Sequence, residues 1–340
     1  MALPPPDPSR RARLNALKLT ALVRDHVGAP ADELGAQPDE FGSGAALMRG
    51  DHAWVLLDER AETRAGAALA WAGKRGAAHV HLVVDDEGAA GLLARRAAYV
   101  TVPTSVWRVD GRLLVPAVAS PLPDAADVDP RGAAFEDLIR GGGAEPVVEH
   151  GVLAGEVQGL EVCRAVIDAF TDAARLEVGI GAHDREAFQM LHGDRPALEA
   201  LRDVVDYVVR YRYVGAPSHA LNRLAAERGL RHRLVHEPGL LGARRLQAVP
   251  PPRPRLNVKD PAACFAVGID GDGTPMIVAI AVGADLDLPL AGAEARAAML
   301  PGARLVLAVP ERDAAPLLPR VASLVVHGAE IRAVPAAVVG

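Results

Sequence analysis

The feature that most constrains the fold is an order of elements that occurs near both ends of the chain. Near the N-terminus a helix pattern precedes an apolar hairpin, and helix, strand, helix and strand follow. The same order returns between residues 221 and 334. Such self-similarity is sought first, because each copy is then one supersecondary unit. The sequence predicts an α/β protein of two or three tandem α-ββ-α-β-α-β modules with small mixed sheets.

The two predicted copies match element by element. The first comprises a helix at 13–27, a hairpin at 45–58, a helix at 62–75, a strand at 79–84, a helix at 87–99 and a strand at 106–109. The second comprises a helix at 221–235, a hairpin at 264–283, a helix at 292–300, a strand at 304–309, a helix at 312–324 and a strand at 331–334. Residues 54–57 and 277–280 are apolar at every position, which predicts equivalent inner strands with both faces covered.

Two proline-rich stretches suggest the domain boundaries. Residues 116–131 lack helical or strand periodicity and are predicted to form a linker, and residues 249–255 are predicted to form an extended tether. The predicted division is therefore an N-terminal module at 1–115, the linker, a middle α+β block at 132–214 and a C-terminal module at 215–340. The middle block resembles a partial third copy.

Composition excludes several classes of protein. The net charge is -6, and no run of apolar residues reaches the length of a membrane span. The first residues lack a charged segment followed by an apolar core, so we expect no signal peptide. Cys163 and Cys264 both lie in strand-like runs. We expect two buried, reduced thiols in a cytoplasmic protein that makes no contact with a membrane.

The best candidates for paired carboxylates are Glu161 and Glu177, on strand patterns of the middle block. On adjacent antiparallel strands they could share one Mg²⁺ or Mn²⁺ ion. His183 and Asp184 follow directly and could assist as a general base or a metal ligand. The alternative is that both glutamates are ordinary solvent-facing strand residues.

This block resembles the PD-(D/E)xK, restriction-endonuclease-like nucleases, which carry an acid on one strand and Glu-x-Lys on the next. Gly179 stands where that family has its lysine. The resemblance therefore implies nuclease-like modules without activity. Residues 176–188 also resemble a stretch in uncharacterised proteins of high-GC bacteria, which implies no function.

Positive charge is concentrated in one segment. Residues 202–259 hold twelve basic and four acidic side chains, and three of the four tyrosines lie at 207–213. Arginine neutralises phosphate and tyrosine stacks on bases, so the pattern is typical of nucleic-acid binders. The candidate residues are Tyr207, Arg210, Tyr211, Arg212, Tyr213, Arg223, Arg244 and Arg245. The alternative is an internal strap whose arginines pair with acidic modules.

Two histidine pairs are weaker candidates for metal binding. His232 and His236 are spaced i,i+4 and share a helical face, but no neighbouring residue completes a zinc site. His79 and His81 face the same side of a strand.

Three functions follow as hypotheses. The first is a cytoplasmic protein that associates with DNA or RNA and carries inactive nuclease-like modules. The second is a nuclease or phosphodiesterase that uses Glu161 and Glu177 with Mg²⁺ or Mn²⁺; no other cofactor is indicated. The third is a non-enzymatic scaffold that binds a protein partner or forms a homodimer.

Overall fold

The computed structural model describes residues 8–28, 37–124, 126–181, 184–186, 195–213, 215–216, 219–253 and 262–335. Contacts divide the chain into two compact units. Unit 1 comprises residues 1–122, 286–294 and 316–329, and unit 2 comprises residues 123–285, 295–315 and 330–340. This division rests on contacts within the fold and does not test the boundaries predicted from the proline-rich stretches. The segments 1–115, 116–131, 132–214 and 215–340 therefore stay a prediction. Within the described ranges no helix has the length and apolar character needed to cross a bilayer.

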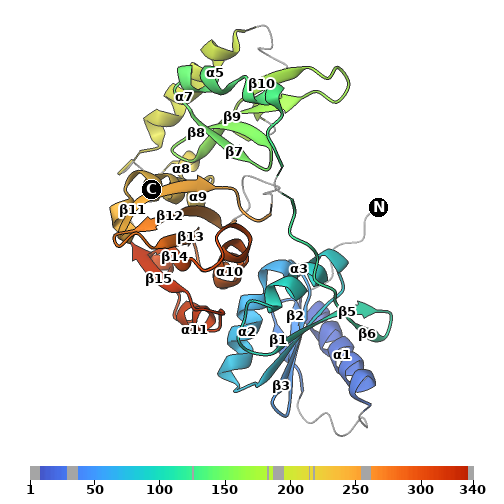
Figure 1. Ribbon diagram of the computed structural model, residues 1–340. Helices are drawn as coiled ribbons and strands as arrows, with labels where there is room; N and C mark the ends of the chain where they lie inside the picture. The colour runs from blue at the N-terminus through green and yellow to red at the C-terminus, as the bar shows by residue number, and fades with distance from the viewer. Residues whose placement is uncertain are drawn as a thin grey trace. The chain divides into compact units, whose positions relative to one another are not determined.

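Unit 1 is built on one mixed sheet with the strand order β1-β2-β3-β4-β5-β6 (Figure 1). The strands are β1 (Asp39–Phe41), β2 (Gly44–Arg49), β3 (His52–Leu57), β4 (His79–Val84), β5 (Thr104–Asp110) and β6 (Leu113–Pro116). β3, β4 and β5 run parallel, and the other pairs are antiparallel. The predicted hairpin and both following strands are confirmed. β1 was not predicted, because its three residues, Asp-Glu-Phe, are too few to show the alternation of a strand.

Helices cover both faces of this sheet, which explains its uninterrupted apolar strands. Helix α1 (Pro8–Val27) packs Leu19 and Val23 against Trp54 and Leu56 of β3. Helices α2 (Ala65–Lys74) and α3 (Glu87–Ala97) lie over the alternate residues, such as Val55, on the other face. Successive strand side chains point to opposite faces, so each must be apolar when both faces are buried. The 3₁₀ helix η1 (Ala61–Thr63) precedes α2.

The first sheet of unit 2 has the order β10-β9-β8-β7 and is antiparallel throughout. Its strands are β7 (Glu145–Glu149), β8 (Val152–Val157), β9 (Leu160–Ile167) and β10 (Ala174–Val178). Helices α4 (Pro130–Ala133), α5 (Glu136–Gly141) and α7 (Ala197–Tyr211) accompany it. Residues 156–167, whose sequence pattern predicts a single strand, belong to two strands, β8 and β9. Gln158 and Gly159 both have positive φ, 47° and 76°, and reverse the chain between β8 and β9.

The second sheet of unit 2 has the order β11-β12-β13-β14-β15. Its strands are β11 (Ala243–Val249), β12 (Cys264–Asp270), β13 (Pro275–Ile280), β14 (Arg304–Pro310) and β15 (Glu330–Val334). β11 was not predicted, and it occupies the stretch before the proline-rich tether. The connections contain α10 (Leu288–Met299), η3 (Glu311–Asp313) and α11 (Leu318–Ser323). Leu290 and Val321 of these connections join the core of unit 1.

The helix predicted at 221–235 is broken into two. Helix α8 (Ala220–Arg223) and helix α9 (Ala226–His236) are separated by Ala225, which has a φ of 47°. Leu230 and Leu234 of α9 pack on the sheet residues Ala266 and Val278, and η2 (Pro238–Leu241) then leads into β11. The break separates α8 from α9, and α9 carries Arg228, Arg231, His232 and His236, which are described below.

The described residues thus form a mixed α/β fold with three small sheets. Two of the sheets share an order of strands and directions. β2, β3, β4 and β5 pair in sequence as antiparallel, parallel and parallel, and so do β12, β13, β14 and β15. The middle sheet differs, because it has no parallel pair.

Candidate functional site

Glu161 on β9 is buried and bound by arginines. Its side chain is 3% exposed, and Arg164 donates to both of its oxygens, at 2.9 and 2.8 Å. Arg185 donates a third hydrogen bond from Nη1 to Oε1, at 2.9 Å. The expectation of a solvent-facing strand residue is therefore wrong for Glu161.

Glu177 on β10 converges with Glu161 on one guanidinium. Arg185 Nε lies 3.7 Å from Glu177 Oε2, and Arg175 donates to Glu177 Oε1 at 2.7 Å. Both candidate carboxylates thus contact Arg185, although the register of β9 and β10 places Arg164, not Glu161, opposite Glu177. The charge between them is an arginine. A hard cation such as Mg²⁺ prefers ionised oxygens that are not already neutralised, so this arrangement favours a structural role.

The two residues expected to assist these carboxylates are placed differently. His183 lies outside the described residues. Asp184 is exposed, and its Oδ2 accepts a hydrogen bond from the backbone N–H of Ile180 at 2.7 Å. The carboxylate of Asp184 therefore stabilises the turn that follows β10.

Helix α9 extends this set of ion pairs. Arg228 Nη1 donates to Glu156 Oε1 at 2.7 Å and Nη2 binds Glu149, while Arg231 Nη1 donates to Glu149 Oε1 at 2.9 Å. Arg231 is only 2% exposed. Unpaired charges could not remain in such an environment. We call Glu149, Glu156, Glu161, Arg228 and Arg231 the buried ion network.

Arg212, which was expected to bind phosphate, is buried, and its guanidinium N–H groups donate to backbone carbonyl oxygens of the protein itself. Its guanidinium donates to the carbonyl oxygens of Gln158, Leu221, Leu224 and Ala225 at 2.6–3.2 Å. Burial lowers its pKa to about 10. Arg212 therefore ties the β8–β9 turn to the junction of α8 and α9, and we withdraw it as a contact for nucleic acid.

Gly159 in the β8–β9 turn allows the backbone of α9 to lie directly against it. A Cβ atom at this position would lie 2.3 Å from the backbone oxygen of Arg228. Only glycine fits here, because the φ is also positive. Helix α9 thus rests directly on the β8–β9 turn.

Two tyrosines and an arginine of the basic segment remain at the surface. Helix α7 buries Ala200, Leu201, Val205 and Val208 on one side. Tyr207 and Tyr213 are 47% and 48% exposed, and Arg210 is exposed. Tyr211 is half-buried and stacks on His219, with ring centroids 4.3 Å apart. The helical period separates these residues into a packed set and a solvent-facing set.

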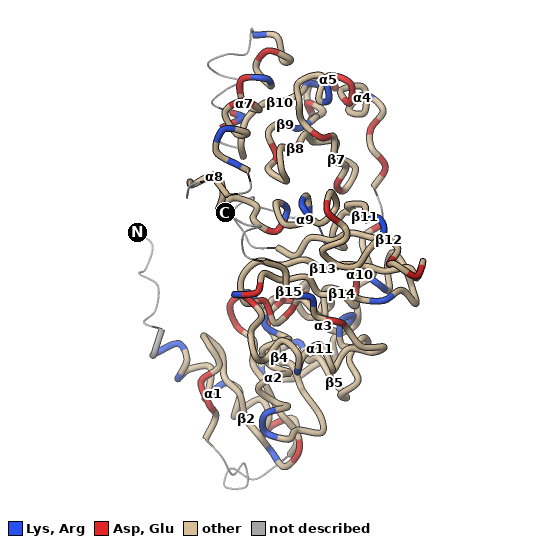
Figure 2. The backbone as a smooth tube through the Cα atoms, turned by 90° about the vertical axis from the view of Figure 1, so that its left-hand side faces the viewer, with Lys and Arg blue, Asp and Glu red and all other residues tan. Residues whose placement is uncertain are grey.

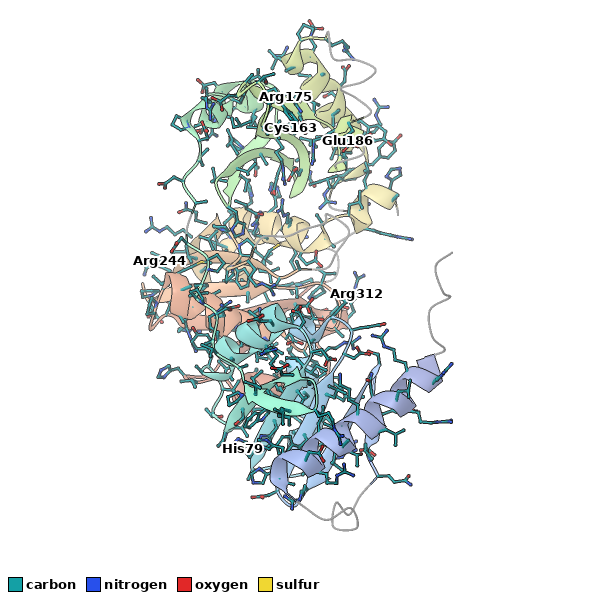
Figure 3. All side chains as sticks on the ribbon, turned by 90° about the vertical axis from the view of Figure 1, so that its right-hand side faces the viewer. His79, Cys163, Arg175, Glu186, Arg244 and Arg312 are labelled. Atoms are coloured by element: carbon teal, nitrogen blue, oxygen red, sulfur yellow. The ribbon has the colours of Figure 1, made fainter. Side chains whose placement is uncertain are left out.

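Three further arginines of the segment are also exposed. Arg223 ends α8, and Arg244 and Arg245 lie on β11, the outer strand of its sheet. Arg244 Nε donates to the carbonyl oxygen of Gly271 at 2.7 Å, and Figure 3 places Arg244 at the periphery of the β11–β15 block. In Figure 2 basic positions recur along α7 and α9. Those on α9 include the buried Arg228 and Arg231, so the excess of positive charge is only partly external.

Unit 1 contains a ladder of imidazole and indole rings. His52, His79 and His81 stack across β3 and β4, and His81 also stacks on Trp54 with centroids 3.8 Å apart. Trp107 Nε1 donates to His81 Nδ1 at 3.0 Å, so Nε2 carries the proton of the neutral ring and donates to His52 Nδ1 at 2.8 Å. Burial, followed by the neighbouring histidines, lowers the pKa of His81 to about 3.

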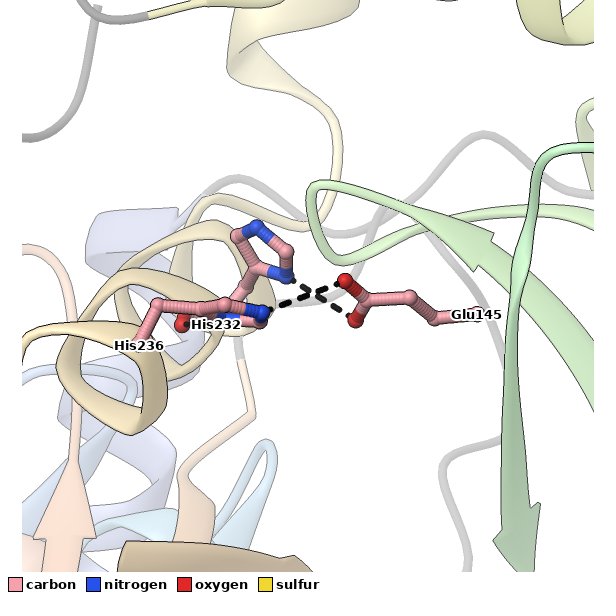
Figure 4. A group of neighbouring side chains, drawn as sticks. All are labelled: Glu145, His232 and His236. Atoms are coloured by element: carbon pink, nitrogen blue, oxygen red, sulfur yellow. Dashed lines mark hydrogen bonds and ion pairs between the residues drawn. The ribbon is translucent and has the colours of Figure 1, made fainter. Parts of the chain in front are cut away.

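His232 and His236 share a face of α9, as the i,i+4 spacing predicts, and a third group joins them (Figure 4). Glu145, the first residue of β7, lies 3.2 Å from His232 Nδ1 and 3.4 Å from His236 Nε2. The hydrogen bond from His232 holds the pKa of Glu145 below its usual value. Sequence spacing could not reveal this group, because Glu145 and His232 are 87 residues apart.

No protein-family model, curated protein or solved structure matches the chain.

Proposed function

We propose that the protein associates with single-stranded or forked nucleic acid through the exposed side chains of Tyr207, Arg210, Tyr213 and Arg223. The observation that carries this proposal is the exposure of two tyrosines and two arginines in one stretch of chain. Among the described residues, neither Arg210 nor Arg223 has a carboxylate within ion-pair distance. Arginines that no carboxylate neutralises attract phosphates, and exposed rings offer stacking faces to unpaired bases.

Arg244 and Arg245 on β11 add a second pair of exposed cations. Such residues would follow the phosphate backbone and carry no sequence information. We therefore expect binding that is steeply salt-dependent and weakly sequence-dependent.

We propose that the protein binds nucleic acid without cleaving it. Arg164, Arg175 and Arg185 neutralise the two glutamates that would hold a catalytic ion. Gly179 leaves no lysine to activate water. We propose a cytoplasmic location, because Cys163 and Cys264 are buried thiols that form no disulfide, as expected in a reducing compartment.

We also propose that the two mixed sheets are copies of one module, of the restriction-endonuclease-like kind that the sequence resembles. Their common order of strands and directions supports this. The glutamates of the buried ion network belong to the antiparallel middle sheet, whereas Arg228 and Arg231 lie on α9, which packs on the sheet of the second copy.

Fluorescence anisotropy with labelled single-stranded DNA, duplex, fork and RNA at about 50 mM salt tests the binding proposal, because phosphate contacts are strong there. Arg210→Ala should remove one phosphate contact. The slope of the logarithm of the binding constant against the logarithm of the salt concentration should then fall by about 1. Tyr207→Ala should weaken single-strand binding by about 1–3 kcal/mol and leave duplex binding nearly unchanged. Arg64→Ala is the matched control, since Arg64 is an exposed arginine of unit 1. Absence of binding, or equal effects of Arg64→Ala and Arg210→Ala, would overturn the proposal.

A second candidate is a non-enzymatic scaffold that binds a protein or forms a homodimer. The observation in its favour is that Arg212, Arg228 and Arg231 are internal, as an interior basic strap requires. Mass photometry at nanomolar concentration tests the homodimer. A monomer that binds nucleic acid would favour the first function over this one.

A further inference from the structure

Three potential ligand atoms converge from two elements of unit 2. His232 Nδ1 and His236 Nε2 come from one face of α9, and the carboxylate of Glu145 comes from β7 (Figure 4). All three groups place a ligand atom within 4.8 Å of the others. The imidazole centroids are 4.2 Å apart, as one helical turn dictates.

When its ring is neutral, His236 directs a lone pair at Glu145. His236 Nδ1 lies 2.9 Å from the backbone oxygen of His232, and a carbonyl oxygen can only accept, so Nδ1 carries the proton. In the neutral ring Nε2 is then an acceptor, yet it faces a carboxylate oxygen at 3.4 Å. Two acceptors in contact repel unless a cation lies between them. A histidine that donates its other N–H to a backbone carbonyl is also the usual arrangement of a metal ligand.

The separations match those of a tetrahedral zinc site. Bonds of about 2.0–2.1 Å at tetrahedral angles place neighbouring ligand atoms about 3.3 Å apart. His232 Nδ1 lies 3.2 Å from Glu145 Oε2 and His236 Nε2 lies 3.4 Å from Glu145 Oε1, so each nitrogen is near this distance from one of the two carboxylate oxygens. Two imidazoles with one carboxylate suit zinc and other divalent transition metals better than Mg²⁺ or Ca²⁺. We propose that Glu145, His232 and His236 form a binding site for a divalent transition-metal ion, with Zn²⁺ as the preferred occupant.

The buried ion network holds the two elements of this site together. Glu145, Val147 and Glu149 point to the same face of β7, since side chains alternate along a strand. Arg228, one turn before His232 on α9, and Arg231, directly before it, both bind Glu149. The helix is therefore fixed against β7 before any metal binds, and the ligands are already close together. Glu145 and His236 are exposed, which leaves a fourth coordination position open to water.

Titration of the tag-free full chain with Co²⁺, followed by visible ligand-field absorption, tests the site. We expect one Co²⁺ per chain with the strong absorption of a four-coordinate ion, displaced by Zn²⁺. Glu145→Gln and His236→Asn should each weaken binding by more than about a hundredfold, because loss of a partner behind a ligand alone costs about 10–100-fold. Glu237→Gln, at the end of the same helix, and His52→Asn, in the ring ladder of unit 1, are the matched controls and should bind as wild type.

Several results would overturn the proposal. One is no Co²⁺ or Zn²⁺ binding by the folded chain, with ¹⁵N NMR showing an imidazolium at His236; a proton would then be the cation. Another is metal binding that survives Glu145→Gln and His236→Asn, or that is lost in His52→Asn. Far-UV circular dichroism establishes that each variant is folded. This site is independent of the proposed nucleic-acid interface, whose variants should leave Co²⁺ binding unchanged.

Discussion

Arg228 on α9 and Glu156 on β8 form a buried ion pair, with 2.7 Å between Nη1 and Oε1. The two residues are 72 positions apart in the chain. Arg228 also binds Glu149, and Arg231 reaches both glutamates. The orientation of α9 thus depends on charges that lie outside water, where removing one partner costs far more than at a surface.

Glu156→Gln should lower the free energy of unfolding of unit 2 by about 3–5 kcal/mol, because the charges of Arg228 and Arg231 would lose a buried partner. Urea-induced unfolding followed by circular dichroism measures the change. The control is Glu136→Gln, which breaks an exposed i,i+4 pair with Arg140 and should cost less than about 1 kcal/mol. Equal effects of the two substitutions would contradict a buried network.

Arg212→Lys should destabilise the chain by about 1–3 kcal/mol, although the charge is retained. A single ammonium group cannot reach four carbonyl oxygens that the planar guanidinium bridges. The same unfolding experiment, with the exposed Arg210→Lys as the control, checks this. The affinity of the folded Arg212→Lys protein for nucleic acid should equal that of wild type. A loss of affinity in a protein that is still folded would indicate that Arg212 contacts nucleic acid after all.

Cys163 should resist thiol reagents in the native protein. Burial raises the pKa of its thiol from an ordinary value of 9.0 to about 12, and the thiolate is the reactive form. Above pH 9 the unfolded chain loses this proton while the folded chain keeps it, so the free energy of unfolding should fall between pH 9 and 12. Labelling rates and pH-dependent unfolding of Cys163→Ala and Cys264→Ala separate the two thiols. Rapid labelling of native Cys163 at about pH 8, just below the ordinary thiol pKa, would refute the prediction.

Unit 1 should lose stability as the pH falls from 6.5 to 3, because His81 is buried. This residue stays neutral in the folded state down to about pH 3, whereas in the unfolded chain it takes up a proton near its ordinary pKa of 6.5. The unfolded state therefore binds the extra proton across this range, and acid favours it. His81→Phe keeps the stacking on Trp54 and should reduce the loss of stability between pH 6.5 and 3. His327→Asn replaces an exposed histidine and should leave that loss unchanged. Thermal unfolding at several pH values measures both, and an unchanged slope in His81→Phe would count against the ladder.

Periodicity and continuous apolar runs predicted most of the secondary structure. The strands at 54–57 and 277–280 are apolar at every position because helices cover both faces, and the structure places them inside their sheets. The errors lie where local signals are short or ambiguous. β1 has three residues, and the turn at Gln158–Gly159 lies inside the strand-like stretch 156–167. Glu161 and Glu177 lie on the adjacent antiparallel strands β9 and β10, but they meet only through Arg185, because the residue opposite Glu177 is Arg164.

The sequence by itself determined the α/β character, the positions of the main strands and helices, and the shared helical face of His232 and His236. Local propensity and side-chain period are properties of short stretches, so they can be recognised without the rest of the chain. Only the tertiary structure decided which arginines are buried, which carboxylate completes the pair of histidines and which guanidinium separates Glu161 from Glu177. Glu145 and His232 lie 87 residues apart and Glu161 and Arg185 lie 24 apart, and the local sequence does not indicate whether a charged side chain will contact water or another charge. Electrostatic pairing is set by the three-dimensional packing of distant segments, and it is there that the chemistry of this protein is specified.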